Sequence, residues 1–326
     1  MPFADIAGHG QIIEVFRRSV RSGKVSHSYI FEGIPGCGRR TTALALIQAL
    51  FCTTIEDDAC GVCVSCRKVS GGNHADIHMV EPLPDKRDIA IDQLREIQRE
   101  LHLRPYEATR KACILEPAER MSVNAANSLL KTLEEPPGNA LIILLSENAD
   151  MLLPTIRSRC QLIRFSPLSP ENIRRLLENS GVDQATAELR SSLSEGSMQR
   201  ALELDDSRIS SRRDALVHHL ESLDLDRIKS IFETSEELSG NRDETLETLD
   251  MLLTFIRDAM YLSAGCGDAV TSSVRQALEK FSSRFSFAQS LQMLTDIVET
   301  RRAVQRNANN KLALDCLFLK LADTMA

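Results

Sequence analysis

The sequence predicts an α/β domain, a parallel sheet with helices on both faces, followed by regions that are entirely helical. Up to residue 165, short apolar runs typical of β-strands alternate with stretches of helical periodicity, which is the pattern of a parallel α/β sheet. Beyond about residue 206, Gly and Pro are scarce and apolar residues recur at helical spacing. We predict strands at residues 27–31, 77–80, 111–115, 140–145 and 161–165, and helices at 42–50, 91–101 and 123–135.

A glycine-rich loop at residues 33–41, GIPGCGRRT, follows the first predicted strand and precedes the first predicted helix. Strand, loop and helix in this order form the setting of a phosphate-binding loop, whose pattern G-x-x-x-x-G-K-[ST] wraps phosphates in backbone N–H groups. The two outer glycines of the pattern are present as Gly33 and Gly38. The turn between strand and helix is therefore expected to be preserved.

The residues that carry the chemistry of this loop are replaced. Arg39 stands where the pattern has Lys, and a bulkier guanidinium cannot simply take the place of a compact ammonium group beneath a phosphate. Arg40 stands where the pattern has the hydroxyl that binds Mg²⁺, and Thr41 supplies a hydroxyl one position too late. The loop could still hold an anion, but we expect neither ATP binding nor ATP hydrolysis by this chain.

A second nucleotide motif is altered where the strand predicted at 111–115 ends. In nucleotide hydrolases an acidic pair at this place holds Mg²⁺ and polarises water. Here Glu116 keeps the first acid, while Pro117 stands at the position of the catalytic carboxylate. For Glu116 we favour a strand-end carboxylate satisfied by nearby donors over a metal-binding role. The two altered motifs together predict a chain without hydrolytic activity of its own.

Four cysteines lie close together in residues 52–66, three of them in a C-x-x-C-x-x-C run: Cys52, Cys60, Cys63 and Cys66. Four thiolates at this spacing can close a tetrahedral Zn²⁺ site, and such a site is structural because no position is left for water. The alternative is four reduced cysteines that share no metal. His74 and His78 follow as possible spare ligands, although a packing role is the favoured interpretation.

The bulk properties are those of an ordinary globular chain. Its 326 residues are enough for two or three domains. The net charge of -7 argues against a surface that coats nucleic acid, while leaving room for a local basic patch. We find no signal peptide and no apolar run long enough to span a bilayer, and we expect a cytoplasmic protein whose cysteines form no disulfide framework.

A Pro- and Ser-rich junction at residues 166–170 separates the α/β region from the helical regions. We place the α/β domain with its cysteine insert at residues 1–165, a small helical domain at 166–206 and an all-α domain at 207–326. On one helix of the last domain, Arg301, Arg302 and Arg306 could touch a partner or DNA, although a solvated basic face is favoured.

Several of these segments carry a family resemblance: HSYIFEG (27–33), the 33–41 loop, the four-cysteine insert, NSLLKTLEEPP (127–137) and SRC (158–160). Together they resemble the delta-prime subunits of bacterial DNA polymerase III clamp loaders, which are AAA+ proteins. The resemblance is strongest from about residue 3 to residue 160, and it thins to helical patterning after about residue 205. It implies an AAA+ domain, a helical lid at 166–206 and an oligomerising collar at 207–326.

The resemblance also implies roles for individual residues. Arg159 would be an arginine finger that reaches into the ATP site of a neighbouring subunit, with Ser158 and Cys160 positioning it and packing beneath it; the alternative is an ordinary surface arginine. Arg157 could share the task. Asn148 matches the position of sensor 1 and could instead cap a turn, and Arg200 matches the arginine of sensor 2, where we expect a structural or interface role.

The implied function is that of a non-hydrolysing stator. Such a subunit joins gamma/tau and delta subunits in a heteropentameric ring that places the sliding clamp on primed DNA. One alternative is an ATP-hydrolysing gamma/tau-type subunit with an unorthodox loop, which the replaced Lys and the lost acidic pair disfavour. Another is a free-standing zinc-dependent nucleic-acid-binding module, which predicts salt-sensitive DNA binding and which the acidic net charge disfavours.

Overall fold

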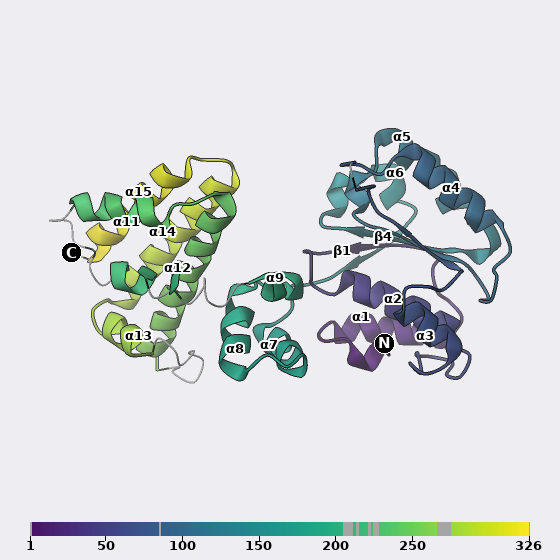
Figure 1. The fold of residues 1–326 in the computed structure, drawn as a ribbon, viewed down its shortest axis with the longest axis horizontal. Helices are drawn as coiled ribbons and strands as arrows, with labels where there is room; N and C mark the ends of the chain where they lie inside the picture. Colours follow the sequence, from purple (N-terminus) through teal and green to yellow (C-terminus); the bar gives the residue numbers. More distant parts are fainter. Residues whose placement is uncertain are drawn as a thin grey trace. The chain divides into compact units, whose positions relative to one another are not determined.

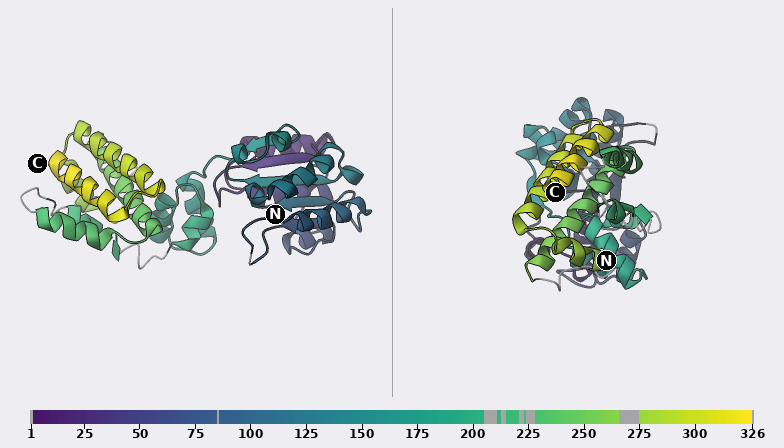
Figure 2. Two further views of the ribbon diagram at one scale, coloured as in Figure 1. Left: turned by 90° about the horizontal axis from the view of Figure 1, so that it is seen from above. Right: turned by 90° about the vertical axis from the view of Figure 1, so that its left-hand side faces the viewer.

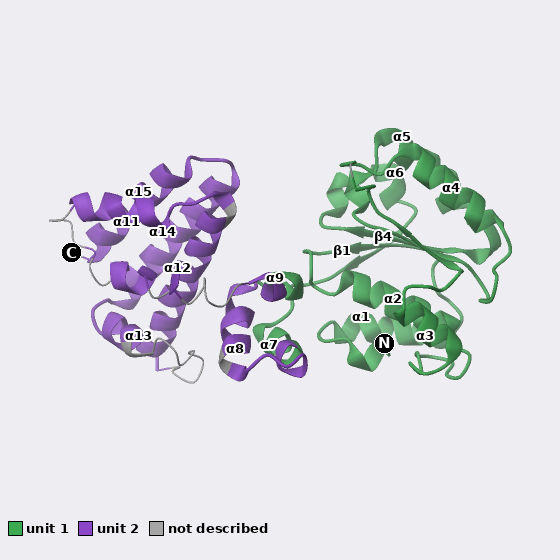
Figure 3. Ribbon diagram, in the orientation of Figure 1, with its two compact units in different colours: residues 1–176, 195–200 green, residues 177–194, 201–326 purple. Residues whose placement is uncertain are grey.

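The computed structural model describes residues 2–84, 86–204, 211–212, 215–220, 223, 228–265 and 275–325. They form two compact units, residues 1–176 with 195–200 and residues 177–194 with 201–326 (Figure 3). The residue boundaries of the three predicted domains remain predictions. None of the helices in the described ranges is long and apolar enough to cross a lipid bilayer.

The first unit is built on a five-stranded sheet in which every strand pairing is parallel, in the order β2-β3-β4-β1-β5. The predicted α/β class is therefore confirmed. The three central strands are almost wholly buried, as expected for parallel strands covered on both faces. The strands are β1 (Ser28–Glu32), β2 (Ile77–Val80), β3 (Ala112–Leu115), β4 (Leu141–Ser146) and β5 (Gln161–Arg164).

Helices cover both faces of this sheet (Figure 1). Alternation along β1 divides the core into two layers, with Phe31 in the cluster shared with α1 and α2 and Ile30 in the cluster shared with α4 and α5. One face carries α1 (Gly10–Arg21), α2 (Arg39–Phe51) and α3 (Val64–Ser70), and the other carries α4 (Ile91–His102), α5 (Val123–Glu134) and α6 (Pro154–Arg157). Short 3₁₀ turns are η1 (Phe3–Asp5), η2 (Ala118–Arg120), η3 (Pro137–Asn139) and η4 (Ala149–Met151).

Helix α5 begins where its sequence predicts, at Val123, and ends one residue before the predicted end, at Glu134. The Ser122 side chain accepts a hydrogen bond from the backbone N–H of Ala125 (3.2 Å), as an N-cap serine should. Leu129 and Leu133 lie in the buried stripe. The helix stops one residue before the Pro-Pro pair, which cannot continue it. This places the end of α5 beside the loop that follows α6, since the two helices are in contact.

Most of the remaining helices belong to the second unit, while α7 and α9 are divided between the two units. The bundle core joins α12 to α13 and α14, and α15 to α11 and α14, and the views in Figure 2 show these green-to-yellow helices side by side. Arg301 does not belong to a solvated basic face, because its Nε donates to Asp250 (2.7 Å) and both side chains are largely buried. The helices are α7 (Pro170–Asn179), α8 (Gln184–Leu193), α9 (Met198–Glu203), α11 (Ile228–Leu238), α12 (Arg242–Ser263), α13 (Arg275–Ser282), α14 (Phe287–Gln305) and α15 (Asn310–Met325).

Candidate functional site

The glycine-rich loop keeps the backbone path of a phosphate-binding loop. It connects the end of β1 to the first residue of α2. Gly36 and Gly38 have φ angles of 73° and 102°, which lie in the left-handed region that only glycine enters readily. The residue that caps α2 makes no side-chain capping bond, so the first N–H groups of the helix face the loop. The turn predicted from the two outer glycines is thus present.

Other segments of the chain contact this loop directly. The backbone N–H of Met198 donates to the Gly36 carbonyl (3.0 Å), and His9 Nε2 donates to the Cys37 carbonyl (2.8 Å). A Cβ atom on Gly36 would clash with the Ser197 hydroxyl oxygen and would lie 2.6 Å from the backbone nitrogen of Gln199, well inside van der Waals contact. The segment that carries Arg200 therefore packs directly on the loop.

We expect Gly36→Ala to loosen this contact and to cost about 1–3 kcal/mol of stability, because it combines backbone strain with a steric clash. Gly72→Ala is the matched control, since Gly72 has nearly the same φ (70°) but open space around it. Denaturant unfolding gives the costs, and amide exchange at Met198 reports the local contact. Equal costs for both variants, with unchanged exchange at Met198, would contradict this account of the packing.

The loop arginine Arg40 is paired with carboxylates at the ends of two strands. Arg40 Nη1 donates to Glu81 Oε1 (2.6 Å), just beyond β2, and to Glu116 Oε2 (3.2 Å), just beyond β3. Burial raises the pKa of Glu116, and the nearby guanidinium groups of Arg40 and Arg39 only partly offset this. Glu116 is thus satisfied by a protein cation, in agreement with the interpretation favoured from the sequence.

Arg39 lies deeper than Arg40. It is only 6% exposed, and its Nη1 has no acceptor among the described residues. The hydroxyl of Thr42, a turn further along α2 and fully buried, also lacks a partner there, whereas Thr41 is only half-buried. Arg39 is therefore a buried guanidinium at the first residue of α2, the position at which the motif has a flexible Lys.

The two sensor-like residues bond within their own segments. The side-chain oxygen of Asn148 accepts from the backbone N–H of Asp150 (2.9 Å), which caps η4. Nη1 of Arg200 donates to Glu195 (2.8 Å). The turn-capping alternative for Asn148 is therefore what the structure has, and the structural role expected for Arg200 agrees with its ion pair. Their sensor roles remain untested predictions.

Arg159 lies at the surface, on the loop between α6 and β5. Its Nε donates to Glu134 Oε1 (2.6 Å), at the end of α5, and its Nη2 donates to the same oxygen. Its Nη1 donates to the Thr155 carbonyl (2.8 Å) and to the Ser158 hydroxyl (3.3 Å). The backbone carbonyl of Arg159 accepts from Ser28 on β1 (2.7 Å), which anchors the loop to the sheet.

The neighbours of Arg159 have different environments. Ser158 donates to the Thr155 carbonyl (3.1 Å), and Arg157 pairs with Asp150 (2.7 Å). Cys160 packs against the core, and burial raises the pKa of its thiol to about 11, which suits a packing role and not a nucleophile. A cavity of about 400 Å³ lies beside the loop, lined by Ile30, Pro154, Arg157, Ser158 and Leu162.

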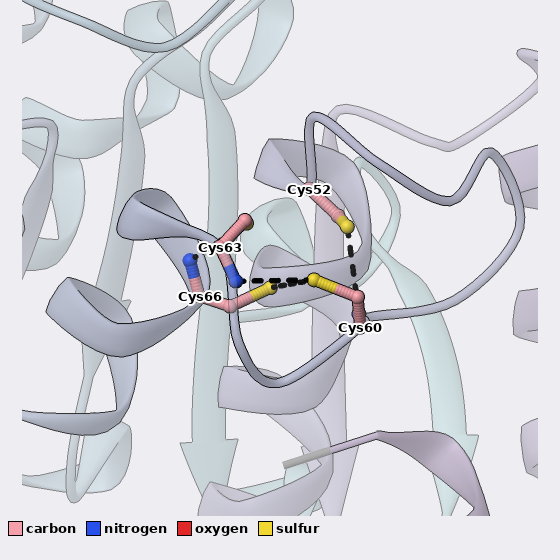
Figure 4. Close-up of side chains that lie close together, drawn as sticks. All are labelled: Cys52, Cys60, Cys63 and Cys66. Carbon is pink, nitrogen blue, oxygen red and sulfur yellow. Dashed lines mark hydrogen bonds between the residues drawn. The ribbon is translucent and has the colours of Figure 1, made fainter.

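The four predicted cysteine ligands converge (Figure 4). Cys52 ends α2, Cys60 lies in the following loop, and Cys63 caps α3, which carries Cys66. All four sulfur atoms lie within 4.8 Å of one another. The Cys60 and Cys66 sulfurs are 3.9 Å apart, close to the ~3.8 Å that tetrahedral geometry gives for metal–sulfur bonds of about 2.3 Å. The cluster could therefore hold a metal ion.

Backbone N–H groups support this donor set. Cys52 accepts from Ile55 and Cys60 (both 3.4 Å), and Cys60 accepts from Cys63 (3.2 Å). Burial alone would raise the pKa of Cys63, but N–H donors of Thr53 and Cys66 outweigh it and lower the pKa to about 6. Such donors stabilise the thiolate of Cys63, the form that binds metal, whereas burial raises the pKa of Cys66 to about 12.

The two histidines are not part of the cluster. His74 is buried, with Nδ1 accepting from the Asp76 backbone N–H (3.2 Å) and Nε2 near the Ser65 hydroxyl (3.3 Å). His78 lies on β2. Neither joins the cysteines in the group of possible metal ligands found among the described residues. His74 thus bonds to protein groups, and the packing interpretation of the two histidines stays a prediction.

Two partners in the site were not identified from the sequence, Glu81 and Glu134. Glu81 directly follows β2 and Glu134 is the last residue of α5, and both elements were predicted from the sequence. Glu81 is 41 residues from its partner Arg40, and Glu134 is 25 residues from its partner Arg159. No local sequence pattern predicts contacts over such separations. The only available signal for Glu134 was an acid at a helix C-terminus, where the helix dipole disfavours negative charge.

Both the α/β region and the C-terminal helical region of this chain are similar to known protein families. A family model described as "DNA polymerase III, delta subunit" matches residues 8–169, and one described as "DNA polymerase III, delta subunit, C terminal" matches residues 210–323. The DNA polymerase III subunit delta' of Bacillus subtilis is 28% identical over 318 residues, 96% of each chain. The subunit delta' of Pseudomonas aeruginosa is 40% identical over 136 residues, 41% of this chain and 42% of that protein.

A relative with a different name is the DNA polymerase III subunit tau of Bacillus subtilis. It is 25% identical over 350 residues, covering 99% of this chain and 62% of the tau sequence. The matched family models carry the delta name over both regions, and the two relatives described first are delta-prime subunits. The chain therefore belongs to the DNA polymerase III delta-prime subunit family.

Proposed function

We propose that this chain is a non-hydrolysing stator of a clamp loader, which supplies Arg159 in trans to the ATP site of a neighbouring subunit. The observation that carries the proposal is the ion pairing of Arg40 with Glu81 and Glu116. Glu116 stands at the position of the carboxylate that holds Mg²⁺ in an active site, and here it is paired with the cation of Arg40 instead. Chemistry is lost at this loop, while Arg159 remains at the surface, where a second subunit can reach it.

The partners of the proposed stator are a gamma/tau-type ATPase subunit and a delta subunit in a heteropentameric ring. The ring would act on a sliding clamp and primed DNA. The family of the chain and the names of its delta-prime and tau relatives support this assembly. Reconstitution tests it: clamp loading by gamma/tau and delta should require this chain, and loading at the full rate without it would contradict the proposal.

The proposed metal is Zn²⁺. Four thiolates close enough to coordinate one ion tetrahedrally are the donor set of structural zinc sites. With all four bound, no coordination position is left for water or substrate. Zinc would fix the turn between α2 and α3, with Cys52, Cys60, Cys63 and Cys66 as its ligands. The role is structural, because no group with catalytic chemistry lies in the cluster as described.

The isolated chain is expected to show neither saturable Mg-ATP binding at millimolar nucleotide nor ATP turnover. The double substitution Arg39→Lys and Arg40→Thr restores the loop pattern, but we still expect no turnover, because Pro117 stands in place of the second acid. Calorimetric titration and phosphate release measure both properties, with the gamma/tau-type subunit as the positive control. Tight Mg-ATP binding with turnover by the unmodified chain would favour an ATPase with an unorthodox loop.

A further inference from the structure

Arg159 is already engaged within its own chain. A guanidinium has five N–H donors. In the structure Nε and Nη2 both donate to Glu134 Oε1, and Nη1 donates to Thr155 and Ser158. Only one N–H of Nη2 is left without an acceptor within the described ranges. An anion from another subunit must therefore compete for donors that the chain itself now uses.

The position of Glu134 is not explained by the helix that carries it. Glu134 is the last residue of α5, and Glu135 is the capping residue after it. The C-terminal end of a helix carries partial negative charge, so a carboxylate there is locally unfavourable. Pairing with Arg159 offsets this cost. Both side chains are partly exposed, at 49% for Glu134 and 32% for Arg159, so the pair is weak enough to be exchanged.

We propose that Glu134 is a latch for Arg159: it holds the guanidinium against α5 until phosphate oxygens of a neighbour's ATP displace its carboxylate. This inference rests on the proposed function of Arg159 in trans. A carboxylate and a phosphate both offer anionic oxygen acceptors to the same Arg edge, so a phosphate oxygen can replace Glu134 Oε1 at Nε and Nη2. The latch keeps the arginine oriented in the free chain, and its negative charge opposes premature engagement.

The test uses the clamp loader reconstituted from this chain with gamma/tau-type and delta subunits, without clamp or DNA. Glu134→Gln keeps the shape and the acceptor oxygen but removes the charge. At saturating ATP we expect single-turnover hydrolysis to rise roughly two- to five-fold, the range that the strength of an exposed ion pair allows. In the Arg159→Ala background, Glu134→Gln should have no effect, because the latch acts only through Arg159.

Two matched controls come from the chain itself. Glu135→Gln removes the same charge one residue away, where the structure gives the side chain no partner within the described ranges. Asp150→Asn breaks the similar ion pair of Arg157 and leaves Arg159 untouched. Neither should raise the rate. Thermal unfolding of each variant confirms that it folds, and Glu134→Asp, which keeps the charge, should restore most of the normal restraint.

The outcomes separate the latch from the proposed function. A rise with Glu134→Gln that vanishes in the Arg159→Ala background supports the latch. An unchanged rate, a lower rate, a rise equal to that of Glu135→Gln, or a rise that persists without Arg159 overturns it. If Arg159→Ala alone leaves hydrolysis unchanged, the proposed function fails first. If Arg159→Ala lowers hydrolysis and Glu134→Gln behaves like its control, only the latch is lost.

Discussion

Arg159→Ala is expected to lower ATP hydrolysis at the adjacent ATPase subunit by on the order of 1,000-fold, the scale reported for an arginine that neutralises charge on a transferring phosphoryl group. Folding should be nearly unaffected, because the pair that Arg159 forms with Glu134 is exposed and such pairs contribute about 0–1 kcal/mol. The measurement is single-turnover hydrolysis in a reconstituted complex where the neighbour of this chain is the only competent ATPase.

Three further measurements test whether the loss of hydrolysis is specific to the guanidinium of Arg159. Arg159→Lys keeps a positive charge but loses the planar fork, so we expect only partial activity. Arg157→Ala is the positional control: it removes a guanidinium two residues away, and it should leave the rate nearly unchanged because the proposed function assigns the finger to Arg159. Subunit assembly, followed by gel filtration, should be the same for all variants. Normal hydrolysis with assembled Arg159→Ala would refute the arginine finger, and an equal loss with Arg157→Ala would show that the two arginines share it.

The sheet could be predicted well because its strands are local features. Each is a short apolar run between polar or turn-forming residues, and the strand predicted at residues 77–80 is β2 as observed. The other four predicted strands differ from the structure by one residue at one or both ends. The order of the strands could not be predicted in the same way, because neighbouring strands in a parallel sheet are chosen by packing between distant segments.

In the candidate site, too, the residue types could be predicted from the sequence, whereas their contacts could not. Replaced motif positions such as Arg39, Arg40 and Pro117 are visible in the sequence because the motif fixes which residue belongs there. What those residues contact depends on the fold. Arg40 meets Glu81, and the Gly36 carbonyl meets the N–H of Met198, only because strand ends and helix starts converge at one edge of the sheet. The sequence therefore shows that the site has changed, and the structure shows what replaced it.

Removing the cysteine cluster should be the most destabilising change that leaves the Arg159 site intact. We expect the purified chain to carry one Zn²⁺, and the double variant Cys63→Ser and Cys66→Ser to carry none. Structural zinc contributes on the order of 10 kcal/mol to the folding of small metal-bound segments, so several kcal/mol should be lost locally, at the C-terminal end of α2 and in α3. Metal analysis and thermal unfolding with and without a chelator measure this.

Cys316→Ser is the matched control, since Cys316 is an exposed cysteine outside the cluster, and it should change neither metal content nor stability. The chelator should destabilise the unmodified chain and the control but not the double variant, which has no metal to lose. The cluster adjoins α2 and α3, whereas Arg159 is held by α5, α6 and β1 on the other core layer. Below its unfolding temperature, the metal-free variant should therefore still stimulate hydrolysis by its neighbour. A chain that contains no zinc, or a double variant as stable as Cys316→Ser, would show that the four thiols converge without a structural metal.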